Sequence, residues 1–298
     1  MGEDHGLGGS HMSSKKDLAS SRLVSKKEKI FNWIIFVLLL LGAVVMVFPL
    51  IYMIATSFMT KNQILSGTLT ILPDPILIGK YSEVLKKGQF INGIFNSLKV
   101  AIPVLIIGGF TSSLAAFGFA KMRFRGKNAL FLALLATIMI PFAVVMIPQY
   151  VMFTKLGWTN TLLPLIIPGC FGNVSIIFFL RQNLIGIPDD LMEAAKLDGY
   201  FRTFLQIFMP LMKGALATQL MLWFMGIWND YLAPTIFLRS EKNWTLQVVI
   251  RSFNSYYAIQ SDYALIMAAS VIAMIPTMAL FFIFQRMIIE SIAISGIK

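Results

Sequence analysis

Long apolar runs without a charged side chain constrain this chain more than any other feature. The first run extends from Ile30 to Thr60, and others occupy residues 100–120, 128–153, 161–180 and 263–285. A helix of about 20 apolar residues crosses the hydrocarbon core of a bilayer. The runs therefore predict an integral membrane protein built from helices.

The composition excludes a soluble domain of this size. Hydrophobic residues make up 57% of the 298 residues, charged residues make up 13%, and the mean hydropathy is +0.76. A typical soluble chain has about a quarter of its residues charged. The net charge of +11 does not indicate nucleic-acid binding, because the basic residues lie in short clusters between the apolar runs, as in membrane proteins. We expect the lipid bilayer as a partner and no nucleic acid.

We predict an all-α membrane domain, residues 30–298, with six transmembrane helices. The expected spans are residues 30–58, 93–120, 128–153, 161–183, 211–238 and 262–286. We expect Pro141 and Pro148 to interrupt the third span. Residues 1–12 resemble a leader added for expression, and residues 13–29 form a basic tail.

The distribution of lysine and arginine predicts the orientation. With the N-terminus in the cytoplasm, six spans place 16 of the 25 basic residues on the cytoplasmic side and 9 on the outer side. The contrast is sharpest between two short loops, because residues 121–127 hold four basic residues and residues 155–160 hold one. Cytoplasmic loops carry the excess of Lys and Arg. We therefore expect a multi-pass protein with both termini in the cytoplasm.

A polar stretch, residues 188–210, separates the fourth expected span from the fifth. Asp189 and Glu193 fall in the first turn of a predicted short helix, where the helix dipole favours carboxylates. Gly199 follows Asp198 where this helix would end, because glycine adopts the left-handed cap conformation easily. An acidic helix that ends at a glycine suits docking onto a partner protein, although a solvated linker between two spans fits the local pattern equally well.

A second helical pattern begins at Phe201 and is expected to stop at Pro210. The stretch is therefore predicted to be a helix, a glycine turn and a second helix between two hydrophobic spans. In the first of these helices, the small side chains of Ala194 and Ala195 would let another surface approach the backbone closely. Glu193 would offer a carboxylate to an arginine on that surface.

The same stretch carries a resemblance. Glu193-Ala194-Ala195, followed by Asp198-Gly199, Ile207 and Pro210, is similar to the EAA motif of ABC-importer permeases. With the topology above, the chain resembles over nearly its whole length the smaller permease subunit of carbohydrate ABC importers of the maltose type. Tyr200 departs from the alanine that this family has after Asp-Gly. The further matching pieces are Asn96-Ser97-Leu98, Arg123-Phe124-Arg125-Gly126, Ile140-Pro141, Ile147-Pro148, Leu156-Gly157, Asn160-Thr161, Trp228-Asn229-Asp230, Trp244-Thr245-Leu246, Met267-Ala268-Ala269-Ser270 and Phe284-Gln285-Arg286.

The resemblance implies a transporter subunit of the type I ABC importer fold in the bacterial inner membrane. It implies a heterodimer with a second, homologous permease, two cytoplasmic ATPase subunits and an extracytoplasmic solute-binding protein, which together import a sugar or oligosaccharide. We expect no catalytic residue and no bound cofactor in this chain, which lacks a G-x-x-x-x-G-K-[ST] phosphate loop. ATP and magnesium would bind to the ATPase subunits. The residues expected to couple to the ATPase are Asp189, Glu193, Ala194, Ala195, Asp198 and Gly199.

Polar and aromatic residues within the expected spans are candidates for the substrate path, because sugars present hydroxyl edges and apolar ring faces. The candidates are Asn173, Gln219, Trp223, Asn229 and Asp230. Hydrogen bonding and packing between helices is the commoner role of such residues. Asp230 could instead cap a helix or pair with a basic loop residue.

Aromatic residues of the loop after the fifth span are candidates for contact with the binding protein. They are Trp244, Tyr256 and Tyr257. Exposed aromatic side chains mark protein interfaces, and anchoring at the membrane surface is the alternative role.

Two other classes of function fit the chain less well. A secondary carrier that works without an ATPase needs ionisable groups at mid-membrane, whereas Asp230 lies toward the outer end of its expected span. A membrane enzyme would need paired carboxylates or a histidine or cysteine cluster. Cys170 is the only cysteine, and His5 and His11 both fall within the leader, so we expect no intrachain disulfide and no metal site.

Overall fold

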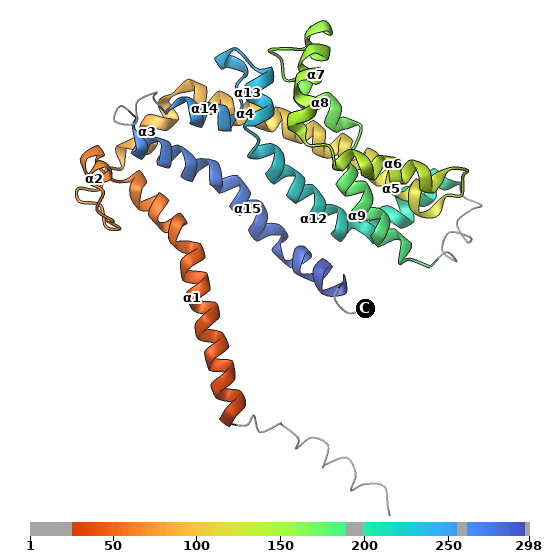
Figure 1. The fold of residues 1–298 in the computed structure, drawn as a ribbon, viewed down its shortest axis with the longest axis horizontal. Coiled ribbons are helices and arrows are strands. Elements are labelled where there is room, and N and C mark those ends of the chain that lie inside the picture. The colour runs from red at the N-terminus through yellow and green to blue at the C-terminus, as the bar shows by residue number, and fades with distance from the viewer. Residues whose placement is uncertain (1–25, 189–198, 255–260, 296–298) are drawn as a thin grey trace, which may run out of the picture. The chain divides into compact units, whose positions relative to one another are not determined.

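The computed structural model describes residues 26–188, 199–254 and 261–295. The described residues form helices joined by loops, without a β-strand among them, which confirms the all-α prediction (Figure 1). The chain divides into two units, Met1–Tyr52 and Met53–Lys298.

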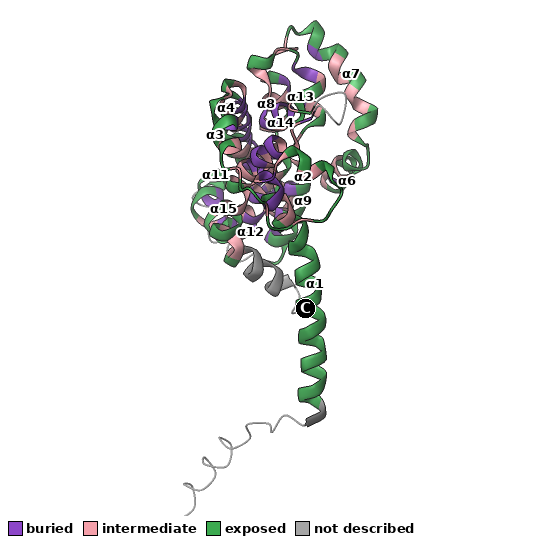
Figure 2. Cartoon of the chain, turned by 90° about the vertical axis from the view of Figure 1, so that its left-hand side faces the viewer, coloured by how far each residue is buried: buried purple, intermediate pink, exposed green. Residues whose placement is uncertain are grey.

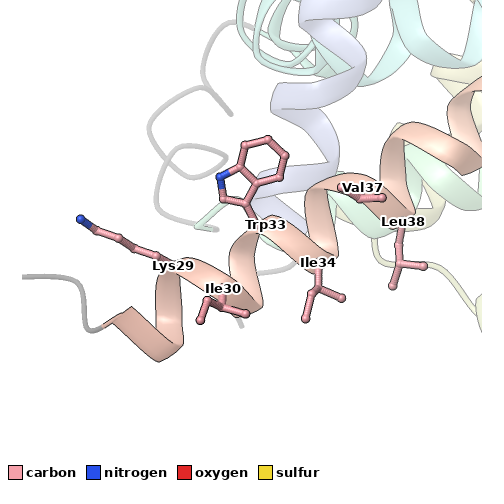
Figure 3. Close-up of a pocket in the computed structure, with 6 residues that line it drawn as sticks. All are labelled: Lys29, Ile30, Trp33, Ile34, Val37 and Leu38. Atoms are coloured by element: carbon pink, nitrogen blue, oxygen red, sulfur yellow. The ribbon is translucent and has the colours of Figure 1, made fainter.

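The described part of the first unit is residues 26–52 of helix α1 (Lys26–Ser57). Large apolar side chains occur on all of its faces and are exposed from Ile30 to Phe48 (Figure 2). A helix that is apolar all round suits a membrane span. Tryptophan next to lysine at its start is typical of the membrane–water interface. Figure 3 shows a shallow hollow on this single helix, lined by Lys29, Ile30, Trp33, Ile34, Val37 and Leu38.

The first long helix of the second unit contains a π-helical turn. Helix α4 (Gly88–Pro103), the turn Val104–Gly108 and α5 (Gly109–Lys121) follow one another without a break. The turn begins directly after Pro103, whose ring crowds the preceding helical turn and which donates no hydrogen bond. A π-helical turn absorbs such a local misfit while the helix continues.

The helix expected to stop at Pro210 does not stop there. Helix α11 (Tyr200–Thr203), a π-helical turn at Phe204–Phe208 and α12 (Met209–Trp228) form one continuous helix. Pro210 lies in the first turn of α12, directly after the π-helical turn. The prediction of a separate second helix before the fifth span was therefore wrong, because membrane helices tolerate proline where the backbone can adjust locally.

The third expected span is broken once. Helices α6 (Lys127–Ile138) and α7 (Phe142–Lys155) meet at an angle of 95°. The break ends at Pro141, which has extended backbone angles, as expected from its missing N–H. Pro148 remains inside α7, so the interruption predicted there was wrong.

Among the described residues, five helices are long and apolar enough to cross a membrane, or six if α6 and α7 count as one broken span. The fourth span, Leu163–Ile185, consists of two helices, and a break after Trp228 separates α12 from a short helix. A helix with four buried residues, α14 (Leu246–Ser252), also occupies the loop after the fifth expected span. The remaining helices are α2 (Lys61–Leu65), α3 (Gly79–Lys86), α8 (Leu163–Cys170), α9 (Val174–Ile185), α13 (Leu232–Phe237), α14 (Leu246–Ser252) and α15 (Tyr263–Ser295).

The second unit has two apolar clusters. The Phe204 cluster packs α5, α6, α9 and the start of the Tyr200–Trp228 helix together, with Phe117, Leu180, Leu184, Phe204 and Phe208 at most 2% exposed. The Trp228 cluster packs α3, α4, α14 and α15 around the end of α12, and it includes Phe90, Phe224, Trp228, Leu246 and Leu265. Each cluster holds one end of the helix bundle.

Small residues recur every fourth position from the π-helical turn into α5, at Gly108, Ser112, Ala116 and Ala120, and form a packing surface. A Cβ atom at Gly108 would lie 2.3 Å from the carbonyl oxygen of Gly169 in α8. Ser112 and Ala116 are fully buried, and the Ser112 hydroxyl accepts a hydrogen bond of 2.8 Å from the N–H of Asn173. The stripe therefore lets α5 approach the break between α8 and α9 closely.

Candidate functional site

The acidic helix predicted before Gly199 lies outside the described residues, together with Asp189, Glu193, Ala194, Ala195 and Asp198. Gly199 itself has φ of +83° and ψ of 145°. Only glycine adopts this extended region readily. The position therefore requires glycine, as expected, but its conformation differs from the left-handed helical cap that the sequence predicted. The Gly199 carbonyl accepts hydrogen bonds from the N–H and the hydroxyl of Thr203, at 3.1 and 2.9 Å, and thereby starts the long helix.

On the other side of the undescribed segment, two basic side chains hold the end of α9. The Lys121 ammonium donates a hydrogen bond of 2.6 Å to the carbonyl of Ile187. Arg181 donates from Nε to the Phe119 carbonyl at 3.2 Å, and its guanidinium lies 4.1 Å from the centre of the Phe131 ring. These contacts join α9 to α5 and α6. The sequence alone assigned no specific role to either cation.

The two flanks of the segment also meet in the Phe204 cluster. The Phe117 ring of α5 lies 5.4 Å from the Phe204 ring and 5.1 Å from the Phe208 ring, measured between centroids. Leu180 and Leu184 of α9 belong to the same cluster. Because these side chains are close-packed, a displacement of either flank must move α5 as well. We call this end of the bundle the Gly199 end.

The substrate-path candidates do not converge on one site. The Asn173 side chain caps α9, since its Oδ1 accepts from the N–H groups of Ser175 and Ile176. The Trp223 ring lies against Gly108, with ring carbon Cη2 2.6 Å from where a Cβ would be. Gln219 lies one turn away on α12 and is half-buried. For Asn173 and Trp223 the contacts are those of a cap and of helix packing.

Asn229 and Asp230 lie in the break between α12 and α13. Asp230 Oδ1 accepts a hydrogen bond of 3.3 Å from the N–H of Ala233, so it caps α13, one of the two alternatives considered from the sequence. Asn229 is exposed, donates to the Met225 carbonyl at 2.9 Å, and accepts from Gln247 of α14 at 3.4 Å. Asn229 therefore contacts the helix inside the following loop.

Asn160 joins the loops at the opposite end of the bundle, which we call the Asn160 end. Its φ is +60°, its Oδ1 accepts from the N–H groups of Arg239 and Ser240 at 3.0 and 2.8 Å, and its Nδ2 donates to the Ser240 hydroxyl at 2.8 Å. Its own N–H donates to the Phe237 carbonyl at 2.8 Å, and its carbonyl accepts from Asn243. Asn160 thereby fixes the loop after α13 to the loop before α8.

Asn96 and Ser97 hold the rest of this loop. Asn96 Nδ2 donates to the carbonyls of Lys242 and Trp244, at 2.9 and 3.0 Å, and the Ser97 hydroxyl accepts from the N–H of Leu246 at 3.0 Å. Three sequence pieces that carry the family resemblance, around Asn96, Asn160 and Trp244, thus meet at the Asn160 end. The sequence showed the pieces but not that they bind one another.

Trp244 was expected to be an exposed contact for another protein. It is half-buried and packs against the Trp228 cluster, which leaves only part of the ring for a partner. Tyr256 and Tyr257 lie outside the described residues.

An ion pair holds the same loop at its far end. The Lys80 ammonium of α3 binds Asp262 at 2.5 Å and Glu83 at 3.0 Å. Burial alone would lower the pKa of Lys80, but hydrogen bonds and charge interactions with Asp262 and Glu83 raise the pKa above its ordinary value. The pair ties α3 to the start of α15.

Comparisons with known proteins agree with this architecture. A chain of a bacterial ABC transporter involved in the import of the acidic polysaccharide alginate has the same fold, with a TM-score of 0.75 and 23% identity over 88% of this chain and 98% of that one. The arabinooligosaccharides transport system permease protein AraQ of Halalkalibacterium halodurans is 30% identical over 92% of this chain and 99% of its own length. The lactose transport system permease protein LacG of Rhizobium radiobacter is 31% identical over 84% of this chain and 90% of its own.

The family model for the binding-protein-dependent transport system inner membrane component matches residues 108–293, which is more than half of the chain. This match includes the Phe204 cluster, the Gly199 end, Asn160 and helices α12 to α14, and it begins after α4. The chain therefore belongs to the family of inner membrane components of binding-protein-dependent transport systems.

Proposed function

We propose that this chain is the transmembrane subunit of an ATP-driven, binding-protein-dependent importer of a sugar or oligosaccharide. The observation that carries the proposal is the similarity, over nearly the full length, to permeases named for arabinooligosaccharide and lactose transport. The chain would form half of the translocation pathway, and a second, homologous permease would form the other half. Two cytoplasmic ATPase subunits would bind ATP and magnesium, and an extracytoplasmic solute-binding protein would deliver the sugar.

In this proposal, residues 188–210 receive the force from the ATPase. Both termini and this stretch lie in the cytoplasm, as the distribution of basic residues predicts. The anchors at the Gly199 end support the assignment. Because Lys121 holds Ile187 and because Phe204 packs on Phe117, a push on the segment between Ile187 and Gly199 reaches α5, α9 and α12 together. The membrane helices would then tilt as a group rather than one at a time.

The test is ATP hydrolysis by the reconstituted complex, stimulated by the sugar-loaded binding protein. Glu193→Ala would remove the carboxylate offered to the ATPase, and Gly199→Val would place a β-branched residue at a positive φ that only glycine tolerates. We expect both variants to assemble with the other subunits but to lose most of the stimulated rate. Gly214→Val, at a helical position where a Cβ meets no atom within 4 Å, serves as the control.

An unchanged stimulated rate in both variants would contradict the proposal. A secondary carrier is distinguished in the same vesicles, because it would take up sugar without ATP and without the ATPase subunits.

A further inference from the structure

A polar cavity lies at the end of α12, between α14 and α15, and the roles assigned above do not explain it. Its volume is about 270 Å³. Its polar lining side chains are Asn229, Gln247, Ser270 and Thr277, and its apolar ones are Ile250, Ala273 and Met274. None of these seven described residues carries a charge.

The walls of the cavity are fixed in place. Ser270, Ala273 and Thr277 lie three and four residues apart on α15 and therefore share one face of the helix. The indole N–H of Trp228, which is 1% exposed, donates a hydrogen bond of 2.8 Å to the Ala273 carbonyl and fastens α12 to this face. Gln247 Nε2 lies 3.3 Å from the Trp228 carbonyl and fastens α14 to the same place.

The same bond to Ala273 leaves the hydroxyl of Thr277 without an acceptor in its helix. A threonine in a helix usually donates to the carbonyl four residues earlier, which for Thr277 is that of Ala273. This carbonyl already accepts from Trp228 and also faces the N–H of Thr277 in the helical pattern. Within the described residues, the Thr277 hydroxyl makes no hydrogen bond, and neither does Oε1 of Gln247. Both groups therefore remain available to a molecule in the cavity.

The cavity lies within the membrane span, so contact between its polar wall and lipid would be unfavourable. Thr277 lies fourteen residues after Tyr263, about 21 Å along α15, and so lies well inside the membrane span. Polar groups without partners are unfavourable against lipid. The Ser270 hydroxyl is satisfied, because it donates to the Ile266 carbonyl at 2.8 Å. The Thr277 hydroxyl and Gln247 Oε1 are the groups of this face that water or a polar ligand would stabilise.

We propose that this cavity binds one uncharged saccharide unit as the substrate crosses the membrane. Neutral donors and acceptors on one side fit the hydroxyl edge of a sugar ring, and Ile250, Ala273 and Met274 fit its apolar face. A uronic acid unit would bring a carboxylate into a site whose described lining offers no cation, at a high desolvation cost. The inference rests on the proposed function and adds a site and a substrate class to it.

The first experiment measures whether the cavity is open to water and which sugars enter it. Thr277→Cys is made in a Cys170→Ala background, and the reconstituted complex is treated with a small water-soluble thiol reagent in the presence of arabinotriose, lactose or trigalacturonate. We expect the reagent to label Thr277→Cys. A neutral sugar should lower the labelling rate at least tenfold, and trigalacturonate should leave it unchanged. Thr235→Cys is the matched control, because Thr235 is exposed on α13 and does not line the cavity. It should be labelled at the same rate in all conditions.

A second variant separates a ligand contact from a packing role. Thr277→Val keeps the shape and removes the hydroxyl, so we expect the sugar concentration for half-maximal uptake to rise about fivefold to tenfold, the loss of one hydrogen bond. Thr137→Val, the same change at an exposed position on α6, should leave uptake unchanged.

Three outcomes would overturn the inference. If Thr235→Cys is labelled and Thr277→Cys is not, the cavity is closed to water and to sugars. The substrate class is wrong if trigalacturonate protects as well as a neutral sugar, and the site is wrong if a neutral sugar that the complex takes up gives no protection. If the wild-type complex takes up no saccharide at all, the proposed function itself fails, and the ligand assignment falls with it; the labelling of Thr277→Cys is still measured, because it does not require transport.

Discussion

Gly108→Ala tests the close approach of the π-helical turn before α5 to α8, on which the packing of the second unit depends. The added Cβ would lie 2.3 Å from the Gly169 carbonyl oxygen and 2.6 Å from a ring carbon of Trp223, where ordinary contact begins at 3.4 Å. The tryptophan ring can turn aside, but the carbonyl belongs to the backbone of α8. The two helices must therefore separate by about 1 Å at this point, the shortfall from ordinary contact.

Overpacking of this kind costs about 1–3 kcal/mol, and each kcal/mol lowers the Tm of a domain of about 250 residues by about 2–4 °C. We expect Gly108→Ala to lower the Tm of the purified protein in detergent by about 2–12 °C, measured by tryptophan fluorescence. Gly214→Ala is the matched control, because nothing lies within 4 Å of its added Cβ, and it should leave the Tm unchanged or raise it slightly. A Gly108→Ala protein as stable as the wild type would refute this account of the helix contact.

Three further predictions concern the two ends of the bundle. Lys121→Met removes the hydrogen bond to the Ile187 carbonyl and should lower the amount of sugar imported per ATP hydrolysed in reconstituted vesicles. Lys213→Met, at an exposed site, should leave this ratio unchanged. The same ratio in both variants would contradict the role of Lys121 as an anchor. Asn160→Ala should destabilise the protein by about 2–4 kcal/mol, since it loses the side-chain hydrogen bonds with Arg239, Ser240 and Asn243 and keeps a strained positive φ. Asn160→Gly relieves the strain and should lose less stability; the reverse order would refute the reasoning. Lys80→Met should lower the Tm near neutral pH. Because the folded-state pKa of Lys80 is raised, the difference in Tm from the wild type should shrink as the pH rises above 10.5. A Tm difference that persists above this pH would exclude the ion pair as its cause.

The membrane class and the number of spans could be predicted because a charge-free apolar run of about 20 residues is typical of a bilayer-spanning helix and rare in soluble domains. The path of the chain between the spans could not be predicted from the sequence. Pro210 reads as a helix stop in isolation, yet the π-helical turn before it lets the helix continue from Tyr200 to Trp228. Whether a proline ends a helix or is absorbed by it depends on packing around it, and here Phe204 and Phe208 of that turn are fully buried against α5 and α9.

The candidate site was predictable only where a residue type implies one role. Gly199 has the positive φ that its place in the motif suggested. Asn173 and Trp223 were chosen as polar or aromatic residues within spans, but their side chains serve a helix cap and a helix contact. Asn160 and Thr277 were not singled out as functional candidates. The role of Asn160 depends on Ser240, 80 residues away, and that of Thr277 depends on the hydrogen bond from Trp228 to Ala273, 45 residues apart; only the fold reveals these contacts.

The central claim is that force from a separate ATPase enters this chain through the acidic segment that ends at Gly199. The most direct measurement replaces Glu193 with a photo-reactive benzoyl-phenylalanine in the complete complex and identifies the protein to which it is joined after illumination. The account predicts an adduct with the cytoplasmic ATPase subunit, and no such adduct when the same group replaces Thr235 on α13. An adduct of position 193 with the extracytoplasmic binding protein, or none with the ATPase in a complex that still hydrolyses ATP, would contradict it.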